Sequence, residues 1–258
     1  MKNPLREIEI LYEDEHVIAV NKAAGLLVLP DRYNPSLPFL SGILKTAKGR
    51  IFVVHRIDKE TSGIILFART PEAHAALNHD FRKHLVRKTY LALCRGGTSQ
   101  KEGEVNLPIV ASRRERGRMI VDEDSGKESR THYAILEEFS GFSLVEVKPE
   151  SGRTHQIRIH LSSIGLPLVA DPLYGDGQPL FLSSFKPRYK SSGDEERPLI
   201  NRVALHASLI VVKHPAMRKR LELSAELPKD MRAALRALRK YAGEEEFTTK
   251  TQMTPRPL

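Results

Sequence analysis

The sequence is poor in cysteine and aromatic residues, and it has no tryptophan. Its one cysteine, Cys94, has no partner for an internal disulfide, and no regular Cys/His spacing indicates a structural zinc site. The fold is therefore expected to need neither a disulfide nor a metal. Aromatic residues make up 6% of the 258 positions, which argues against the dense base-stacking surface of an RRM or an OB-fold.

Long apolar runs are also missing. No stretch approaches the roughly 20 apolar residues of a membrane-spanning helix. The N-terminal MKNPLREIEILYEDE carries acidic residues where a signal peptide needs an apolar core. We therefore expect a cytoplasmic protein with no membrane partner. With 40% hydrophobic and 28% charged residues, the chain has the composition of a folded globular protein, of one large α+β domain or two small ones.

Positive charge is in excess. Lysine and arginine number 41 against 32 aspartate and glutamate, which gives a formal net charge of +9 and an isoelectric point near 9.6. Such an excess favours a polyanionic partner, most often nucleic acid. The alternative is a moderately basic surface that serves only solubility.

Hydrophobic patterns predict an extended mixed sheet of mostly antiparallel strands. Residues 7–20 alternate around an acidic turn, as in a hairpin, and further strands are predicted at 51–54, 64–67 and between 90 and 149. Strands are also expected at 204–212 and 220–227. A helix is predicted after Thr70, with Thr70 as its N-cap and Pro71 as its first residue. Two more are predicted from Thr154 to Ile164 and from Pro228 to Gly243.

Two segments lack such periodicity. Residues 176–202 are rich in serine, lysine and proline, and we expect an exposed insertion there. Its Lys186, Arg188 and Lys190 either touch a bound nucleic acid or only solvate a loop. Residues 244–258 have no pattern and predict a flexible tail.

A dense polar cluster, HRIDKETSG, occupies residues 55–63 between two apolar strands. One interpretation is a charged surface turn in which Asp58 caps the backbone. The other is a carboxylate that an arginine keeps ionised and oriented as a nucleophile or base. Loops held between strands commonly carry function.

A second cluster, SGRTHQIRIH, occupies residues 151–160. Gly152 permits a close approach of the backbone, and a helix that begins at Thr154 would direct unpaired N–H groups at a phosphate. Arg153 and Arg158 are donors suited to a phosphate or a carboxylate. Taken singly, each histidine is more often a structural hydrogen-bonding group than a catalyst.

Four strings carry a resemblance to a known family: HRIDKETSGIILFART, RKTYLAL, KPESGRTHQIRIHLSSIGLPLVADPLYG and ALHA. Their order and approximate spacing resemble those of the RluA-type pseudouridine synthases, from about Ile8 to Val212. The resemblance implies the fold of that family, α+β with a mixed sheet flanked by helices and loops around a central catalytic cleft. It also implies an isomerase that converts specific uridines of rRNA or tRNA to pseudouridine.

The resemblance assigns roles to single residues. Asp58 is implied as the essential catalytic residue, Tyr90 as the residue that stacks on the flipped base and assists proton transfer, and Arg158 as the ion-pair partner of Asp58. Arg56 would contact RNA near the displaced nucleotide, and Leu205 would pack beside the tyrosine. The expected substrate-binding residues are His55, Arg56, Thr61, Arg153, Thr154, Gln156 and Leu205.

The expected organisation follows from the same resemblance. Residues 1–243 would form a single catalytic domain that binds an RNA stem-loop without an N-terminal S4 domain, a cofactor or a metal. No obligatory protein partner is implied, so a monomer is expected. The turn that usually reads Lys-Pro-Ala-Gly is here Lys22-Ala23-Ala24-Gly25, which predicts a less rigid turn.

Two other functions are compatible with parts of the sequence. A non-catalytic RNA-binding or ribosome-assembly protein that keeps the fold is the first, and loss of Asp58 would have favoured it. A metal-dependent nuclease or phosphatase is the second, but it needs clustered carboxylates. Asp58 has no nearby partner in metal-ligand register.

Overall fold

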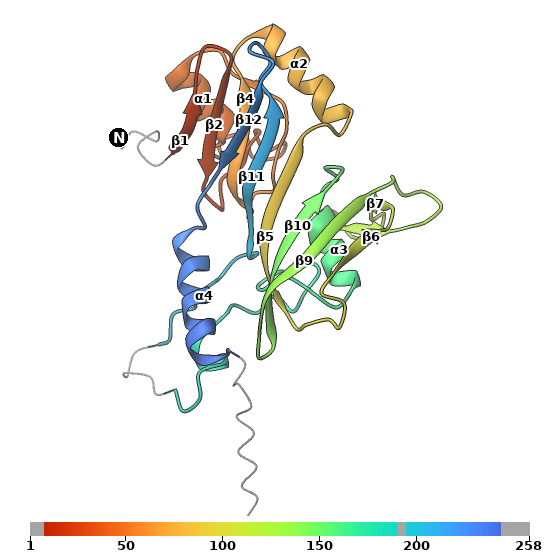
Figure 1. Cartoon of the computed structure of the whole chain (residues 1–258), viewed down its shortest axis with the longest axis vertical. Helices are drawn as coiled ribbons and strands as arrows, with labels where there is room; N and C mark the ends of the chain where they lie inside the picture. Colours follow the sequence, from red (N-terminus) through yellow and green to blue (C-terminus); the bar gives the residue numbers. More distant parts are fainter. Residues whose placement is uncertain (1–7, 190–194, 244–258) are drawn as a thin grey trace, which may run out of the picture.

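A computed structural model describes residues 8–189 and 195–243, and a ten-stranded sheet is its main element. The strand order is β1-β2-β4-β11-β5-β10-β9-β6, with β12 beside β11 and β3 beside β4 (Figure 1). All neighbours pair antiparallel except β4 and β11, which are parallel. The predicted α+β fold with a mixed, mostly antiparallel sheet is confirmed.

The elements have the following bounds. The strands of the large sheet are β1 (Glu9–Glu13), β2 (Val17–Lys22), β3 (Phe52–Val53), β4 (Ser62–Ala68), β5 (Arg87–Arg95), β6 (Glu102–Asn106), β9 (Arg130–Phe139), β10 (Phe142–Pro149), β11 (Leu205–Lys213) and β12 (Arg220–Ser224). A separate hairpin pairs β7 (Ile109–Ala111) with β8 (Met119–Val121). The helices are α1 (Leu40–Lys48), α2 (Pro71–Arg82), α3 (Gln156–Ser163) and α4 (Lys229–Tyr241), with a short 3₁₀ turn at Leu182–Ser184.

Local signals placed several elements correctly. The predicted N-terminal hairpin is the antiparallel pair β1 and β2. Helix α2 begins as expected, because the Thr70 hydroxyl oxygen accepts a hydrogen bond from the Ala73 N–H at 3.1 Å and Pro71 is its first residue. Helix α4 buries Met231, Leu235 and other apolar residues of one stripe.

One helix was not predicted, and the predicted start of another needs correction. Helix α1 was not predicted, because only Leu40 and Leu44 mark its buried face and a proline-rich loop precedes it. Helix α3 begins at Gln156 rather than at Thr154. His155 precedes it in the left-handed region, at φ 57°, so the helical hydrogen bonding cannot extend further back.

The segment 176–202 was expected to be an exposed insertion, and this is wrong at both of its ends. Leu180 and Ile200 are buried and exchange backbone hydrogen bonds, with the Leu180 N–H donating to the Ile200 carbonyl at 2.8 Å. Both belong to an apolar cluster that also holds Leu235 and Leu238 of α4. The two ends of the segment therefore pack with α4 in one apolar cluster. Lys190 and the predicted tail, residues 244–258, lie outside the described residues.

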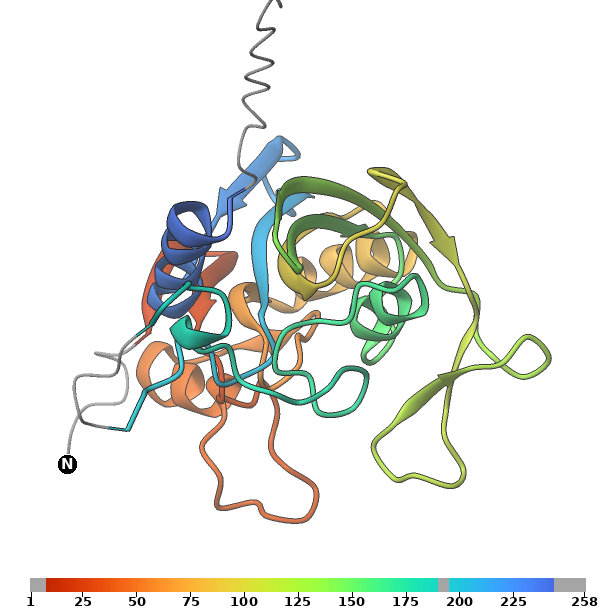
Figure 2. The same cartoon turned by 90° about the horizontal axis from the view of Figure 1, so that it is seen from below.

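Two projections extend from the body of the protein (Figure 2). One is the loop of residues 30–38, and the other is the β7–β8 hairpin, whose tip carries Arg113, Arg114 and Arg116. The Arg116 guanidinium lies 4.1 Å from the ring centroid of Tyr33, a cation–π contact between the two. Tyr33 keeps 76% of its surface exposed.

Candidate active site

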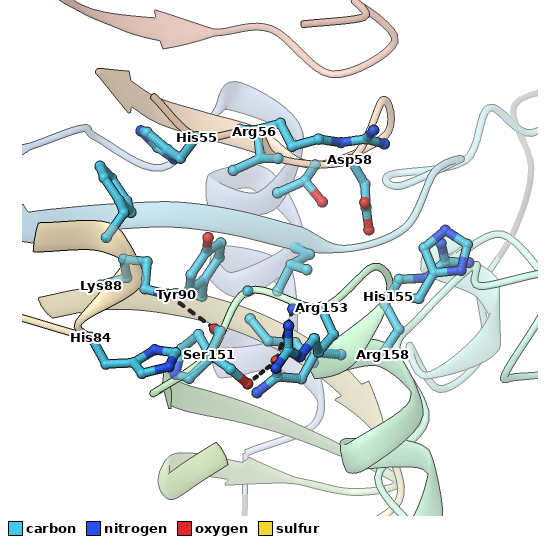
Figure 3. A pocket seen from close by; sticks show the side chains of 18 of the residues that line it. His55, Arg56, Asp58, His84, Lys88, Tyr90, Ser151, Arg153, His155 and Arg158 are labelled. Atoms are coloured by element: carbon cyan, nitrogen blue, oxygen red, sulfur yellow. Dashed lines mark hydrogen bonds between the residues drawn. The ribbon is translucent and has the colours of Figure 1, made fainter. Parts of the chain in front are cut away.

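A cleft of about 480 Å³ opens beside the centre of the sheet. The loop that connects β3 to β4 forms one wall, and the segment between β10 and α3 forms the other. Figure 3 shows His55, Arg56 and Asp58 along the first wall, Ser151, Arg153 and Arg158 along the second, and Tyr90 between them. Nine of the ten predicted site residues line this cleft: His55, Arg56, Asp58, Thr61, Tyr90, Arg153, Gln156, Arg158 and Leu205.

Hydrogen bonds from neighbouring residues fix the backbone around Asp58. The Thr61 N–H donates to the Asp58 carbonyl at 3.2 Å, and the Gly25 N–H donates to the Lys59 carbonyl at 2.9 Å. The ammonium of Lys22 donates to the same Lys59 carbonyl at 2.9 Å, and its side chain is fully buried. The turn therefore holds the Asp58 loop without the proline that the family motif usually has.

The Lys22 ammonium is an unusual anchor, since it forms no ion pair within the described part of the chain. Burial lowers the pKa of Lys22 to about 7, against the opposing influence of the charges on Glu60 and Asp58. Two further carbonyls, of Ala23 and Leu26, accept its remaining N–H bonds at 3.0 and 2.8 Å. Satisfying all three donors offsets the cost of burying an amine.

The Asp58 side chain has no polar partner in the described part of the chain. Its carboxylate forms no hydrogen bond or ion pair with any residue in the ranges 8–189 and 195–243, although it lies at the edge of the cleft and is only half-buried. A carboxylate held by its backbone with its oxygens unengaged is available to a bound ligand.

Tyr90 forms the floor of the cleft. It lies in β5, opposite Val147 of β10 and Ala207 of β11, and 9% of its surface is exposed. Burial, and then the negative charge of Asp58, raise the pKa of the Tyr90 hydroxyl well above its usual value. Tyr90 is therefore a neutral hydrogen-bond donor at any physiological pH.

Arg158 does not form the expected ion pair with Asp58. Its Nε and Nη2 groups donate to the two carboxylate oxygens of Asp171, both at 2.7 Å, and the pair is buried. Although burial alone would lower the pKa of Arg158, hydrogen bonding to Asp171 and its charge outweigh this and raise it. Asp58 acts on Arg158 only through its charge. The reason is geometric. The Asp171 carboxylate is oriented so that each of its oxygens accepts from one N–H of the planar guanidinium.

The His55 side chain has a structural role. Its Nε2 accepts a hydrogen bond from the Leu66 N–H at 2.9 Å, and its ring stacks on Phe81 with the centroids 4.7 Å apart. Burial, and then the charge of Lys88, lower the pKa of His55 to about 3. The imidazole is therefore neutral and is not a general base toward a substrate. Arg56, next to it, is exposed and directed along the same wall (Figure 3).

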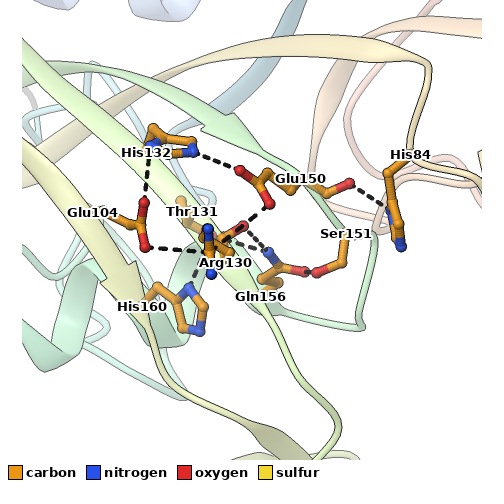
Figure 4. Close-up of polar contacts among 9 residues, drawn as sticks. All are labelled: His84, Glu104, Arg130, Thr131, His132, Glu150, Ser151, Gln156 and His160. Atoms are coloured by element: carbon orange, nitrogen blue, oxygen red, sulfur yellow. Dashed lines mark hydrogen bonds and ion pairs between the residues drawn. The ribbon is translucent and has the colours of Figure 1, made fainter.

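Gln156 uses its whole amide to brace the opposite wall (Figure 4). Its oxygen accepts from the Ser151 hydroxyl at 2.7 Å and from the Arg153 N–H at 3.0 Å. Its amino group donates to the Arg130 carbonyl at 2.9 Å and to the Thr131 hydroxyl at 3.0 Å. A full set of partners leaves no donor or acceptor for a substrate, so the predicted binding role of Gln156 is replaced by a structural one.

Thr154 is the predicted site residue that the cleft excludes. Its side chain is exposed in the turn before α3, outside the lining. Because α3 begins at Gln156, and because the Arg153 N–H is taken by Gln156, the expected phosphate site at a helix start on Thr154 is not formed.

Sequence reasoning also missed residues that the cleft contains. Lys88 lines it, donates to the Ser151 carbonyl at 2.9 Å, and has its pKa lowered by burial to about 8. His84 lines it from a left-handed conformation and contacts the Glu150 carbonyl through Nδ1 at 2.9 Å. Lys88 adjoins Tyr90 in RKTYLAL, so the motif itself was the available signal. No such signal marks His84. The Glu150 carbonyl that it contacts lies 66 residues further along the chain, and only the folded structure brings the two together.

Across residues 8–189 and 195–243, no group of three or more histidine, cysteine, aspartate or glutamate side chains is arranged to hold a metal ion. In the same ranges, every helix is too short or too polar to cross a bilayer.

The chain is similar to proteins of known family. Residues 16–163 match the family model described as RNA pseudouridylate synthase. The chain is 35% identical over 241 residues to "Ribosomal large subunit pseudouridine synthase D" of Zymomonas mobilis, covering 90% of this chain and 73% of that protein. It is 38% identical to the protein of the same name from Nitrosomonas europaea, covering 90% of this chain and 65% of that one.

Solved structures agree with the sequence comparison. The human protein "RNA Pseudouridylate Synthase Domain Containing 4" superposes with a TM-score of 0.68 at 26% identity, over 90% of this chain and 93% of that one. "Human RNA Pseudouridylate Synthase Domain Containing 1" gives a TM-score of 0.63, also at 26% identity, over 93% of this chain and 98% of that one. The fold expected from the sequence motifs is confirmed.

Proposed function

Because the chain belongs to the RluA-type family of RNA pseudouridine synthases, we propose that it isomerises specific uridines of RNA to pseudouridine. The reaction breaks the bond between uracil N1 and ribose C1′, turns the base, and joins C1′ to C5, whose proton is released as N1 regains one. Atoms and electrons balance within the nucleotide, so the reaction needs no redox cofactor.

We propose ribosomal RNA of the large subunit as the substrate, ahead of transfer RNA. Several relatives that match 90% of the chain carry large-subunit pseudouridine synthase in their names. The net charge of +9 and the exposed arginines of the β7–β8 hairpin suit a polyanion. We also propose that the enzyme is monomeric and cytoplasmic, and that residues 1–243 act as one catalytic domain. The single sheet that runs from β1 to β6 supports the proposal of one domain.

The observation that carries the proposal is the uncommitted carboxylate of Asp58 above the buried Tyr90. The target nucleotide must leave its stack to reach such a cleft, at a cost of a few kcal/mol. Asp58 then attacks the sugar or the base, or removes a ribose proton to give a glycal. Tyr90 contacts the extruded base with its ring and keeps a neutral hydroxyl for proton transfer.

Arg158 takes a different role from the one expected. Its pairing with Asp171 fixes the second wall of the cleft, and its positive charge acts on Asp58 without a direct contact.

Asp58→Asn is the direct test. We expect this variant to fold and bind RNA as the wild type does, and to release no tritium from transcripts of bacterial large-subunit rRNA labelled at uridine C5. Asp124→Asn removes an exposed carboxylate outside the cleft and should keep full activity. Parallel transcripts of tRNA decide the substrate class. An Asp58→Asn enzyme that still releases tritium would refute the assignment, and a wild type that binds both RNAs without turnover would favour the non-catalytic alternative.

A further inference from the structure

Tyr174 lies behind the second wall of the cleft and contacts three separate parts of it. Its hydroxyl accepts a hydrogen bond from the N–H of Met119, the first residue of β8 after the arginine-bearing turn, at 2.8 Å. The same hydroxyl lies 3.0 Å from Nδ1 of His155. The Arg158 guanidinium lies 5.0 Å from the centroid of its ring. Tyr174 does not itself line the cleft, whereas His155 does.

The position of Tyr174 is well fixed. Its carbonyl accepts a hydrogen bond from the Ser162 hydroxyl of α3 at 2.6 Å, and its N–H donates to Asp171 at 3.2 Å. On the hairpin side, the Arg118 guanidinium lies 5.8 Å from the ring centroid. One side chain therefore connects the arginine-bearing hairpin, the buried Arg158–Asp171 pair and His155.

The hydrogen bonds of this hydroxyl favour one tautomer of His155. Because the Tyr174 oxygen already accepts from Met119, its own proton needs an acceptor, and Nδ1 of His155 is the one within reach. An imidazole that accepts at Nδ1 carries its proton at Nε2 when neutral. Burial, the largest effect on this ring, lowers the pKa of His155 and favours the neutral form.

The other edge of the His155 ring is unengaged. Nε2 has no hydrogen-bond partner among the residues that the structure describes, and the ring lies at the end of the second wall that is nearest to Asp58 (Figure 3). The charged groups that act on the ring are Asp58, Arg158, Asp171 and Arg56. A neutral N–H donor in such a place suits an acceptor oxygen of the bound nucleotide.

We propose that Tyr174 is a positioning residue, which holds His155 as the Nε2–H tautomer with its N–H available to RNA and joins the arginine hairpin to the catalytic wall. This inference rests on the proposed function and adds to it a residue outside the cleft. Its effect falls on RNA binding, because neither Tyr174 nor the hairpin contacts Asp58.

Tyr174→Phe tests the proposal, with Tyr12→Phe as the matched control; Tyr12 lies in β1 and its hydroxyl donates to Asp14. With transcripts of large-subunit rRNA, we expect Tyr174→Phe to raise KM about tenfold, the equivalent of one lost hydrogen bond, and to leave kcat within a factor of three. In ¹⁵N-labelled enzyme, nitrogen shifts of His155 should report the Nε2–H tautomer in the wild type and a mixture in Tyr174→Phe.

The outcomes separate this proposal from the function on which it rests. An active wild type with an Nδ1–H tautomer of His155 would overturn the positioning role, and so would a Tyr174→Phe enzyme with unchanged KM and unchanged tautomer. If Tyr174→Phe does not fold, the wild-type tautomer alone decides. A wild type without turnover would instead count against the proposed function, whatever the state of His155.

Discussion

The partner of Arg158 can be identified by unfolding measurements on single and double variants. The structure pairs its guanidinium with Asp171 through two contacts of 2.7 Å, where the sequence motif implied Asp58. Removing one member of a buried ion pair leaves the other charge without compensation, at a cost of about 3–5 kcal/mol. For a protein of this size, such a loss lowers the melting temperature by roughly 10 °C.

The two members of the pair differ in what they leave behind. After Arg158→Ala, the Asp171 carboxylate still accepts from the N–H groups of Leu173 and Tyr174 at 3.0 and 3.2 Å. After Asp171→Ala, a buried guanidinium and both N–H groups lose their partner. We therefore expect a loss of about 3 kcal/mol for Arg158→Ala and about 5 kcal/mol for Asp171→Ala.

The double variants decide between the two partners. Arg158→Ala combined with Asp171→Ala should be no less stable than Asp171→Ala alone, because the pair has already been broken, so the coupling energy is about 3 kcal/mol. Arg158→Ala combined with Asp58→Ala should be additive within about 0.5 kcal/mol. Urea unfolding followed by circular dichroism measures each free energy. Strong coupling to Asp58 and additivity with Asp171 would refute the observed pairing.

Other predictions concern catalysis, RNA binding and acid stability. Tyr90→Phe should bind RNA normally and lose about 10²–10⁴-fold in tritium release if its hydroxyl transfers a proton; a wild-type rate would leave it a stacking role only. Replacing Arg113 and Arg114 with glutamine should weaken RNA binding and flatten its salt dependence by roughly 0.7 in log–log slope for each lost phosphate contact; unchanged titrations from low to high salt would contradict a role for the hairpin. Against the effect of burial, hydrogen bonds from two backbone N–H groups and from His214 lower the pKa of Asp14 from 3.8 to about 2. Because this folded-state pKa is depressed, its contribution of roughly 2 kcal/mol is complete above pH 4 and lost as the pH falls toward 2. Asp14→Asn should therefore flatten the acid limb of the stability curve, and an unaltered limb in urea titrations would contradict this assignment.

Local and motif-level information in the sequence was sufficient for much of the molecule. Alternating apolar residues predicted the β1–β2 hairpin, and the Thr70-Pro71 pair predicted the start of α2, because both signals act over a few residues. The two polar clusters, together with RKTY and ALHA, contain the ten residues that were expected at the site. Nine of the ten line the cleft, since the motifs occupy loops and strand ends that converge at the centre of the sheet.

Tertiary structure alone decided which group each polar side chain binds. The sequence motifs contain several carboxylates that could pair with Arg158. Only the packing of α3 against the following loop places the two oxygens of Asp171 opposite Nε and Nη2 of Arg158. The same holds for Gln156, whose partners lie 3, 5, 25 and 26 residues away, and for His55, whose Nε2 accepts from the Leu66 N–H. A motif records which residue types a site needs. Hydrogen-bond partners depend on distances of a few tenths of an ångström and on burial, which arise only when distant segments pack together.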